Sequence, residues 1–388
     1  MSPVVLNSQS RNSHSEIPGL SVGITVPGQP TFDLSAIKYV SVTNNNFYEA
    51  DTWELAAVLS GQKAPYKSPV WWGNQGLIEA RIKASYDKGL PTELIVGVVD
   101  DLDIRLRDDL LILSGRDYTE RFIDTRLSDT FLSVQNGKIF LNQTASQIVE
   151  QLLSEYFPTM AYDVVQTTTV IGTQAATQNA LMFRNRSLWD VITWLAQNES
   201  GTDPNGNPVP FVAYVKGRTL YFGPMTAGGL FDIRWNPISE AVTLNVSRNL
   251  SLANDIRVTV QGFGPLGRYQ AVASGKHAAA PSTDFPKGYQ HYVYTINGLT
   301  QQQASNRATS LALSLSQHEL VCRVGMPADF TLDPYGQVRI REIDASGKVT
   351  VWDTNYWINA VTWKFSLDKG ANMDLWLKNH PVGQQVTL

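Results

Sequence analysis

The sequence has little of the chemistry on which secreted and membrane proteins depend. It holds one cysteine, Cys322, so an internal disulfide framework is excluded. Cys322 stands among β-forming residues and is interpreted as a buried strand residue. No apolar run reaches the roughly 18 residues that span a bilayer, and the N-terminus lacks the features of a secretory signal. We therefore expect a soluble protein, without membrane insertion, made in a reducing compartment.

Charge is also sparse and nearly balanced. Charged residues make up 17% of the chain, and the formal net charge is -4. A surface that holds duplex DNA needs clustered Lys and Arg, because phosphate contacts supply most of the affinity. The composition therefore argues against nucleic-acid binding, whereas a mildly acidic wall would let DNA slide past without adhering.

Motifs for catalysis, cofactors or metals are missing or have simpler explanations. There is no Gly-x-Ser-x-Gly elbow, and the lone thiol has no neighbouring histidine. Gly262–Gly267 matches GxGxxG, but Pro265 and the polar continuation offer no helix N-terminus, so a turn between strands is the better interpretation. No histidine has a second ligand at metal spacing. The five histidines are His14, His277, His291, His318 and His380.

An acidic stretch also lacks the pattern of a known site. It has no calcium-loop spacing and no terminal bidentate Glu, so solvated strand edges explain it better. Its members are Asp100, Asp101, Asp103, Asp108 and Asp109. Paired carboxylates for glycoside hydrolysis are the one enzyme alternative that 35 acidic residues leave open. We expect no catalytic residue, no metal and no cofactor.

Alternating apolar and polar residues dominate both ends of the chain. Ile78–Ser85 has the two-residue period of a half-buried strand, and Val361–Asp368 has the same period before an Asp-Lys-Gly turn. Three segments between them are helical. Capping boxes open these helices at Thr144, Ser187 and Thr300, and their apolar stripes predict one buried face each.

These patterns predict a β-rich α+β fold with two antiparallel, tube-like β-barrel domains flanking a small mixed α+β domain. A length of 388 residues agrees with two or three domains. The expected divisions are an N-terminal arm at 1–35, a first β-barrel at 36–128, a mixed domain at 129–225, and a second β-barrel at 226–388 with an inserted helix at 300–318.

Several segments resemble the baseplate hub family of contractile phage tails, which includes Mu-like hubs, the late control protein D group and the hub part of type VI spike proteins. The strand exit LILSGRDYTERFID is similar to the family signature that closes its first barrel. The order of SLWDVITWLAQNESG, KGRTLYFG, QVRIRE and the last hairpin is also similar. The chain departs from the family where Tyr335 splits a Pro-Gly pair and where Trp363 replaces a frequent histidine.

The resemblance implies a homotrimer whose six barrels form a ring between a sixfold tail tube and a threefold central spike. The implied partners are the tail tube or a tube-initiator protein, the spike and baseplate wedge proteins, with DNA passing through the lumen without specific binding. The implied location is the tail baseplate of the virion, after assembly in the host cytoplasm. Arg116, Asp117 and Asp124 of the signature are candidates for a structural or interface network.

Two alternatives stay open at this point. The first is the hub of a tailocin or of a secretion-type contractile machine, which would have the same mechanics. The second is a carbohydrate-binding β-sandwich protein, in which strand aromatics form a platform for sugar stacking. The aromatics considered for that platform are Trp352, Trp357 and Trp376.

Overall fold

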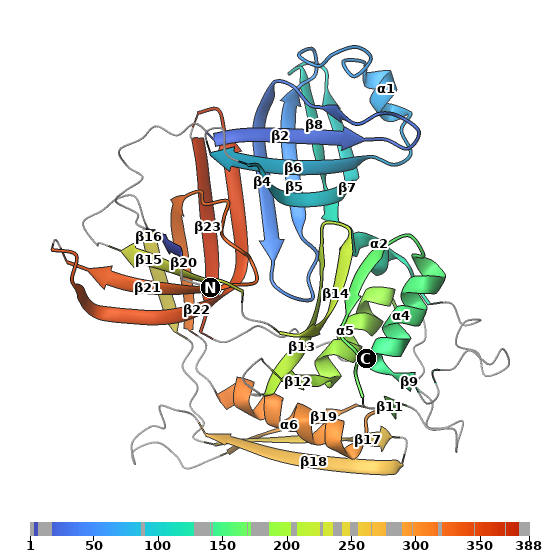
Figure 1. The fold of residues 1–388 in the computed structure, drawn as a ribbon, viewed down its shortest axis with the longest axis vertical. Coiled ribbons are helices and arrows are strands. Elements are labelled where there is room, and N and C mark those ends of the chain that lie inside the picture. The colour runs from blue at the N-terminus through green and yellow to red at the C-terminus, as the bar shows by residue number, and fades with distance from the viewer. Residues whose placement is uncertain are drawn as a thin grey trace.

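The computed structural model describes most of the chain. The described residues are 4–6, 18–86, 90–127, 140, 143–168, 170–171, 186–202, 208–225, 228–235, 243–248, 255–264, 266–276, 289–296, 298–316, 320–344, 346–368 and 370–379. Strands predominate, as the alternating sequence pattern predicts (Figure 1). The helices are α1 (Pro69–Gly73), α2 (Thr119–Asp124), α4 (Ala145–Tyr156), α5 (Leu188–Asn198) and α6 (Gln301–Ser316).

One curled sheet, which we call the β wall, contains the strands of both β-rich ends of the chain. Its first β unit comprises β2 (Pro18–Thr25), β3 (Phe32–Asp33), β4 (Ile37–Asn45), β5 (Thr52–Val58), β6 (Glu79–Tyr86), β7 (Thr92–Arg105) and β8 (Leu110–Asp117). Its second β unit comprises β1 (Val4–Leu6), β15 (Leu230–Trp235), β16 (Thr243–Arg248), β20 (Leu320–Pro327), β21 (Gln337–Ile343), β22 (Val349–Ser366) and β23 (Gly370–Lys378).

The two β units join where β4 pairs with β22. The pairing is antiparallel and places Val42 opposite Trp363 and Val40 opposite Phe365. All four side chains are buried in one core, which also contains apolar residues from both units. The β wall is therefore continuous across the seam, although its strands come from opposite ends of the sequence.

The mixed unit packs below the β wall in Figure 1 and has its own core. Helices α4 and α5 lie near a small sheet, and α6 covers a separate three-stranded sheet. The strands of this unit are β9 (Gln143–Thr144), β10 (Ala161–Val164), β11 (Val170–Ile171), β12 (Ser200–Thr202), β13 (Pro208–Lys216), β14 (Thr219–Pro224), β17 (Asp255–Gly264), β18 (Gly267–Lys276) and β19 (Tyr289–Thr295).

The helix starts agree with the sequence patterns. Thr144 with Gln147 and Ser187 with Asp190 form reciprocal capping boxes. Thr300 and Gln303 exchange the same pair of bonds, with backbone-to-side-chain distances of 3.0 and 3.2 Å. Each cap satisfies donors that the first helical turn leaves unpaired, which fixes where the helix begins.

Two expected divisions differ from the structure. Part of the expected arm is strand β2, which pairs with β6 along eight residues and buries Val22 and Ile24 completely. Ser, Gly and Pro mask the alternation of this segment, so composition alone suggested a loose arm. The segment 255–316, assigned to the second barrel, packs instead into the core of the mixed unit through Ile256, Val258 and Ala304.

Candidate functional site at the junction of the units

A six-residue loop between β4 and β5, residues 46–51, connects all three units, and we call it the junction loop. Its first residue binds β22, since the backbone N–H of Asn46 donates to the Asn359 carbonyl at 2.8 Å and its side-chain amide donates to the Ile358 carbonyl. Tyr48 then binds β13 through a backbone bond of 3.1 Å to the Ala213 carbonyl. This short loop thus binds the first β unit to both of the other units.

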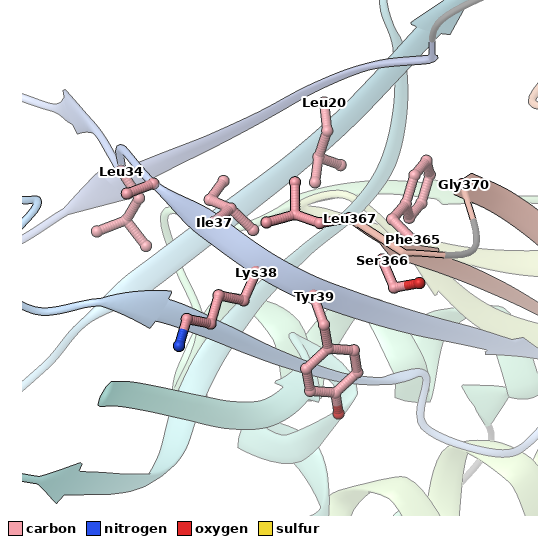
Figure 2. A pocket seen from close by; sticks show the side chains of 10 residues that line it. Leu20, Leu34, Ile37, Lys38, Tyr39, Phe365, Ser366, Leu367 and Gly370 are labelled. Carbon is pink, nitrogen blue, oxygen red and sulfur yellow. The ribbon is translucent and has the colours of Figure 1, made fainter. Parts of the chain in front are cut away.

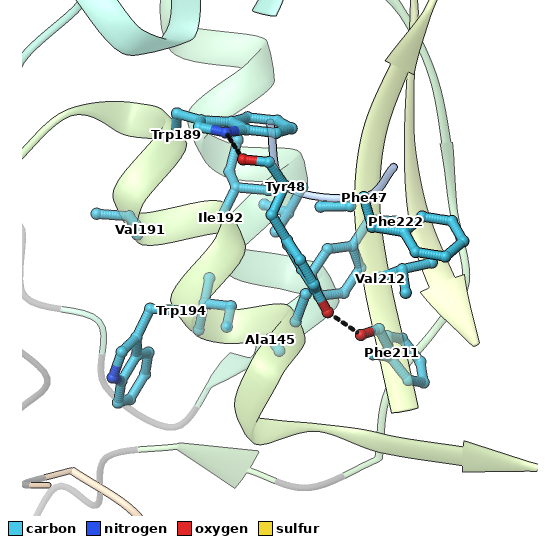
Figure 3. Packing of buried hydrophobic residues seen from close by; sticks show 14 of the residues in the cluster. Phe47, Tyr48, Ala145, Trp189, Val191, Ile192, Trp194, Phe211, Val212 and Phe222 are labelled. Atoms are coloured by element: carbon cyan, nitrogen blue, oxygen red, sulfur yellow. Dashed lines mark hydrogen bonds between the residues drawn. The ribbon is translucent and has the colours of Figure 1, made fainter. Parts of the chain in front are cut away.

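Tyr48 is a buried residue of the junction loop that contacts the mixed unit. Its hydroxyl donates to the Phe211 carbonyl, and its own carbonyl accepts from the indole N–H of Trp189 at 2.8 Å (Figure 3). The backbone at Tyr48 is in the left-handed region, with φ of 76°, which an L-residue other than Gly, Asn or Asp rarely adopts. Burial raises the pKa of the phenol, so this hydroxyl stays a donor.

Three aromatic rings meet beside the loop, one from each unit. Phe47 stacks on Tyr335 at 5.4 Å between ring centroids, and Tyr214 lies 4.1 Å from Tyr335. Offset aromatic pairs contribute about 0.5–1.5 kcal/mol each beyond the area they bury. This cluster therefore stabilises one arrangement of the three units.

Two carboxyls are buried at the same place. Asp51 accepts from the backbone N–H of Asn45 at 2.7 Å, and Asp117 accepts from the N–H and hydroxyl of Thr119. Burial raises the pKa of Asp51 well above its usual value, and the neighbouring Asp117 raises it further. Burial also raises the pKa of Asp117, against the opposing effect of the Thr119 bonds. The pair therefore holds protons at a pH where surface aspartates have lost them.

Arg116 lies next to Asp117 in the strand, but its side chain points to the outer surface. Its guanidinium binds the Asp100 carboxylate at 2.7 Å and lies 3.6 Å from Glu120 and 3.7 Å from Asp124. The ion pair with Asp100 raises the pKa of Arg116, and burial together with Asp100 raises that of Glu120. We call these four residues the Arg116 cluster.

The structure thus divides the three predicted site residues. It brings Arg116 and Asp124 together, whereas Asp117 faces the buried junction on the other side of β8. Sequence reasoning missed Asp51 and Glu120 as their partners. The alternation of β8 could have indicated the division, because consecutive strand residues such as Arg116 and Asp117 point to opposite faces of the sheet.

A second polar contact connects the first β unit to the mixed unit. Glu79 is buried in β6 and accepts from the hydroxyl of Tyr118 and from the guanidinium of Arg218 at the β13–β14 turn. The turn places Gly217 at φ of 62°, a left-handed conformation that glycine adopts readily. A charge buried in this way requires such partners, so the contact fixes the turn against β6.

A shallow pocket of about 340 Å³ lies over the seam of the β wall (Figure 2). Its lining comes from β2, the start of β4 with the residues before it, and the end of β22 with the turn that follows. Leu367 was expected to continue the buried row of β22, but it lies beyond the strand end and is 79% exposed. Three of the lining residues are polar, namely Lys38, Tyr39 and Ser366. A small number of convergent polar groups usually orients a ligand in a binding pocket.

The other motifs have structural explanations. Gly262–Gly267 forms the end of β17 and the start of β18, which pair across a tight turn, as the sequence interpretation predicted. Cys322 is a buried strand residue, and burial raises its thiol pKa to about 12. Among the described strands, β8 alone pairs with β7 at Asp101 and Asp103, which agrees with a strand edge, whereas Asp108 and Asp109 lie in the β7–β8 turn.

Metal and sugar chemistry find little support in the described part of the chain. Within it, no three His, Cys, Asp or Glu side chains gather as metal ligands. Of the histidines only His291 is described; His14, His277, His318 and His380 lie outside the described residues, as does the side chain of Trp352. Trp357 packs against the mixed-unit core, and Arg323 lies over the ring of Trp376. Across the described residues, no helix has the length and apolarity to span a bilayer.

Comparisons by sequence find nothing: no protein-family model and no curated protein matches the chain. Comparisons by structure do. The tail protein from Neisseria meningitidis MC58 matches with a TM-score of 0.59 at 13% identity, over 94% of this chain and 98% of that one. The 43 kDa tail protein of prophage MuSo2 from Shewanella oneidensis matches with a TM-score of 0.56 at 11% identity, over 92% and 96% of the two chains.

A third match extends the comparison to secretion systems. A chain in the half-lidded structure of a Francisella PdpA–VgrG complex has a TM-score of 0.52 at 10% identity. The match spans 96% of this chain but 59% of that one. The chain therefore has a fold found in phage tail proteins and in a VgrG complex, and the resemblance inferred from its sequence is confirmed at the level of fold.

Proposed function

We propose that this protein is a structural, non-enzymatic subunit of a contractile phage tail, the hub of its baseplate. The observation that carries the proposal is the β wall, in which two β units form one curved surface with the mixed unit attached beside it. The similarity to a tail protein and to a prophage tail protein, over nearly the full length of the chains compared, supports it. A tail location in the virion, after assembly in the host cytoplasm, belongs to the same proposal.

In this proposal three copies close into a ring. Each copy contributes two β units, so the ring presents six units to a sixfold tail tube and keeps threefold symmetry toward a central spike. Closed rings leave no unsatisfied interface, which suits a particle of fixed size. The tube or a tube-initiator protein, the spike and the wedge proteins are the proposed partners, and DNA passes through the lumen without specific binding.

The junction has a mechanical role in the proposal. The junction loop, the aromatic cluster and the Glu79 contact hold the three units in one orientation, which a ring subunit needs in order to match its neighbours. The Arg116 cluster lies on the surface and is a candidate for contacts between subunits, whereas Asp117 contributes from within. No residue is assigned a reaction.

The mass of the purified protein in solution tests this proposal. Light scattering over a dilution series should give a trimer that persists on dilution, and electron microscopy should then show rings. Trimer interfaces of a stable ring should bury at least about 2,000 Å². A strict monomer at all concentrations, with and without a spike protein, would contradict the hub assignment.

A hub of a tailocin or of a secretion-type machine is the second candidate. The likeness to a chain of the PdpA–VgrG complex favours it. Purified particles separate the two, because a tailocin or secretion machine contains no packaged genome. A carbohydrate-binding function is less favoured, since Trp357 and Trp376 already have partners within the chain.

A further inference from the structure

The three-stranded sheet of β18, β17 and β19 has one covered face and one open face. Helix α6 packs on the inner face, against Val258 and Val260, which are fully buried. The opposite side of the sheet looks away from the rest of the molecule at the foot of Figure 1. Strand alternation sends every second residue to this outer side.

The open face has an apolar centre and basic surroundings, and we call it the basic face. Phe263 is 61% exposed, Val293 is 53% exposed and Val272 is 46% exposed. Val272 and Val293 flank Thr259 in direct cross-strand register. The three strands carry three Lys and Arg residues against one carboxylate. The basic face consists of Arg257, Phe263, Arg268, Val272, His291 and Val293.

Apolar side chains in the middle of an open sheet face indicate a contact surface, since solvated faces of antiparallel sheets are usually polar. β17 and β18 have ten residues each and β19 has seven, so at about 3.3 Å per residue and about 4.8 Å between strands the sheet face covers about 430 Å². One partner of a standard interface contributes about 800 Å². The basic face is therefore large enough for about half of such a contact.

A surface of opposite charge lies at the other end of the molecule. Between Asp100 and Asp124 the chain has seven carboxylates besides the buried Asp117, against four arginines. Asp101 and Asp108 are exposed, and they form no ion pair within the described residues. Leu106, at the β7–β8 turn, is 70% exposed and adds an apolar group. We call this region, together with the Arg116 cluster, the acidic edge; it belongs to the upper half of Figure 1.

We propose that the basic face of one copy docks on the acidic edge of the next copy. The proposal rests on the ring assigned above and names two of its contacting surfaces. Charge complementarity selects a second copy as the occupant, because both signs are present on one chain, each beside exposed apolar groups. Since the two surfaces differ and lie at opposite ends, the contact is head-to-tail, which is the kind that closes a ring.

Charge reversal tests the contact. The full chain carrying R257E and R268E places carboxylates opposite carboxylates, so the concentration at which the trimer dissociates should rise at least about tenfold. The D101K and D108K pair should have the same effect. Joining all four substitutions in one chain restores opposite charges across each contact and should recover the trimer. K216E, on an exposed residue outside both surfaces, is the matched control and should leave the trimer unchanged.

The outcomes separate the two proposals. A trimeric wild type whose R257E/R268E variant stays equally trimeric, with unchanged circular dichroism, overturns this contact and leaves the ring intact. A wild type that stays monomeric at all concentrations, with and without a spike protein, overturns both. Rescue by the fourfold variant also excludes misfolding as the cause of dissociation. If wild type binds duplex DNA in a salt-dependent way and R257E/R268E loses that binding while staying trimeric, the basic face serves nucleic acid and the self-contact is wrong.

Discussion

Asp51 and Asp117 show how single residues make the junction sensitive to pH. Because burial raises their pKa values, the folded chain holds a proton that the unfolded chain has already released. Their contribution to the free energy of unfolding is therefore complete below the unfolded pKa, about 4, and is lost as the pH rises through the folded value, about 7 for Asp117.

Asp117→Asn should remove much of this dependence. Between pH 6 and pH 8.5 the wild type should lose about 1–3 kcal/mol more unfolding free energy than the variant, as measured by urea denaturation. Burial also raises the pKa of Glu199 to about 7, so its contribution to the unfolding free energy falls over the same pH range. Glu199 is present in both proteins, so its contribution drops out of the difference between them. Asp101→Asn, at an exposed position, is the control and should follow the wild type. Parallel profiles for Asp117→Asn and wild type would refute the assignment.

Arg116 is predicted to matter for assembly more than for stability. Its ion pairs lie at the surface, with 31% of its side chain exposed, and such pairs contribute up to about 1 kcal/mol. Arg116→Gln should therefore shift the unfolding midpoint only slightly while weakening the trimer in light scattering. Arg339→Gln is the matched control, since Arg339 pairs with Asp353 at the surface of the second β unit, outside the acidic edge. A trimer as stable as wild type in the Arg116 variant would exclude the cluster from the interface.

The sequence offered the residues of the Arg116 signature as candidates, but it could not show how they divide between the surface and the interior. The motif contains Arg116 and Asp117 side by side, and alternation implies opposite faces. Asp51 and Tyr335 reach the same place from two loops that are distant in sequence. Contacts of this kind depend on the tertiary fold, and no local pattern encodes them.

At the scale of elements, the junction loop is the part whose disruption should be most informative. Tyr48→Phe removes one buried hydroxyl and leaves the Phe211 carbonyl without that donor, which should cost about 1–2 kcal/mol of unfolding free energy. Urea denaturation measures this loss. Tyr162→Phe, at a tyrosine that is 48% exposed, is the control and should change the free energy little. Equal effects from both substitutions would show that the Tyr48 bond does not stabilise the junction.

Helices were predicted better than the strand at the N-terminus. Capping boxes are local, so Thr144, Ser187 and Thr300 marked the three helix starts correctly. Strand β2 contains Pro18, Gly19, Ser21 and Gly23 among its apolar residues, and it becomes a strand only because β6 is available to pair. β-structure of this kind depends on the partner strand more than on intrinsic preference.

At the scale of the whole molecule, the two cores predict how the chain unfolds. One core combines Leu55 of the first β unit with Trp363 and Leu375 of the second, so both β units should unfold in a single transition. The mixed unit has a separate core and can unfold in a second one. Tryptophan fluorescence of Trp53→Phe and Trp363→Phe variants, compared in urea, should give coincident midpoints for the two β units. Midpoints that differ clearly would show that the seam does not couple them.

The overall class could be read from periodicity, but the division into units could not. The alternation in Val361–Asp368 predicts a strand without showing that β4 is its neighbour. The segment 255–316 lies between strands of the second β unit in the sequence, yet it packs on the mixed unit. There, α6 covers the apolar face of β17 and β18. Neighbouring segments of the sequence can therefore belong to different cores, and a local pattern does not show which core each segment joins.

The seam between β4 and β22 also gives the molecule a direction of strength. Seven residues on each side pair in antiparallel register, from Tyr39 to Asn45 and from Ala360 to Ser366. A pull along these strands strains all of the bridging hydrogen bonds at once, whereas a pull across them opens the bonds one after another. The subunit is therefore stiff in shear and compliant in peeling, so the orientation of its strands relative to an applied load decides how much load it can carry.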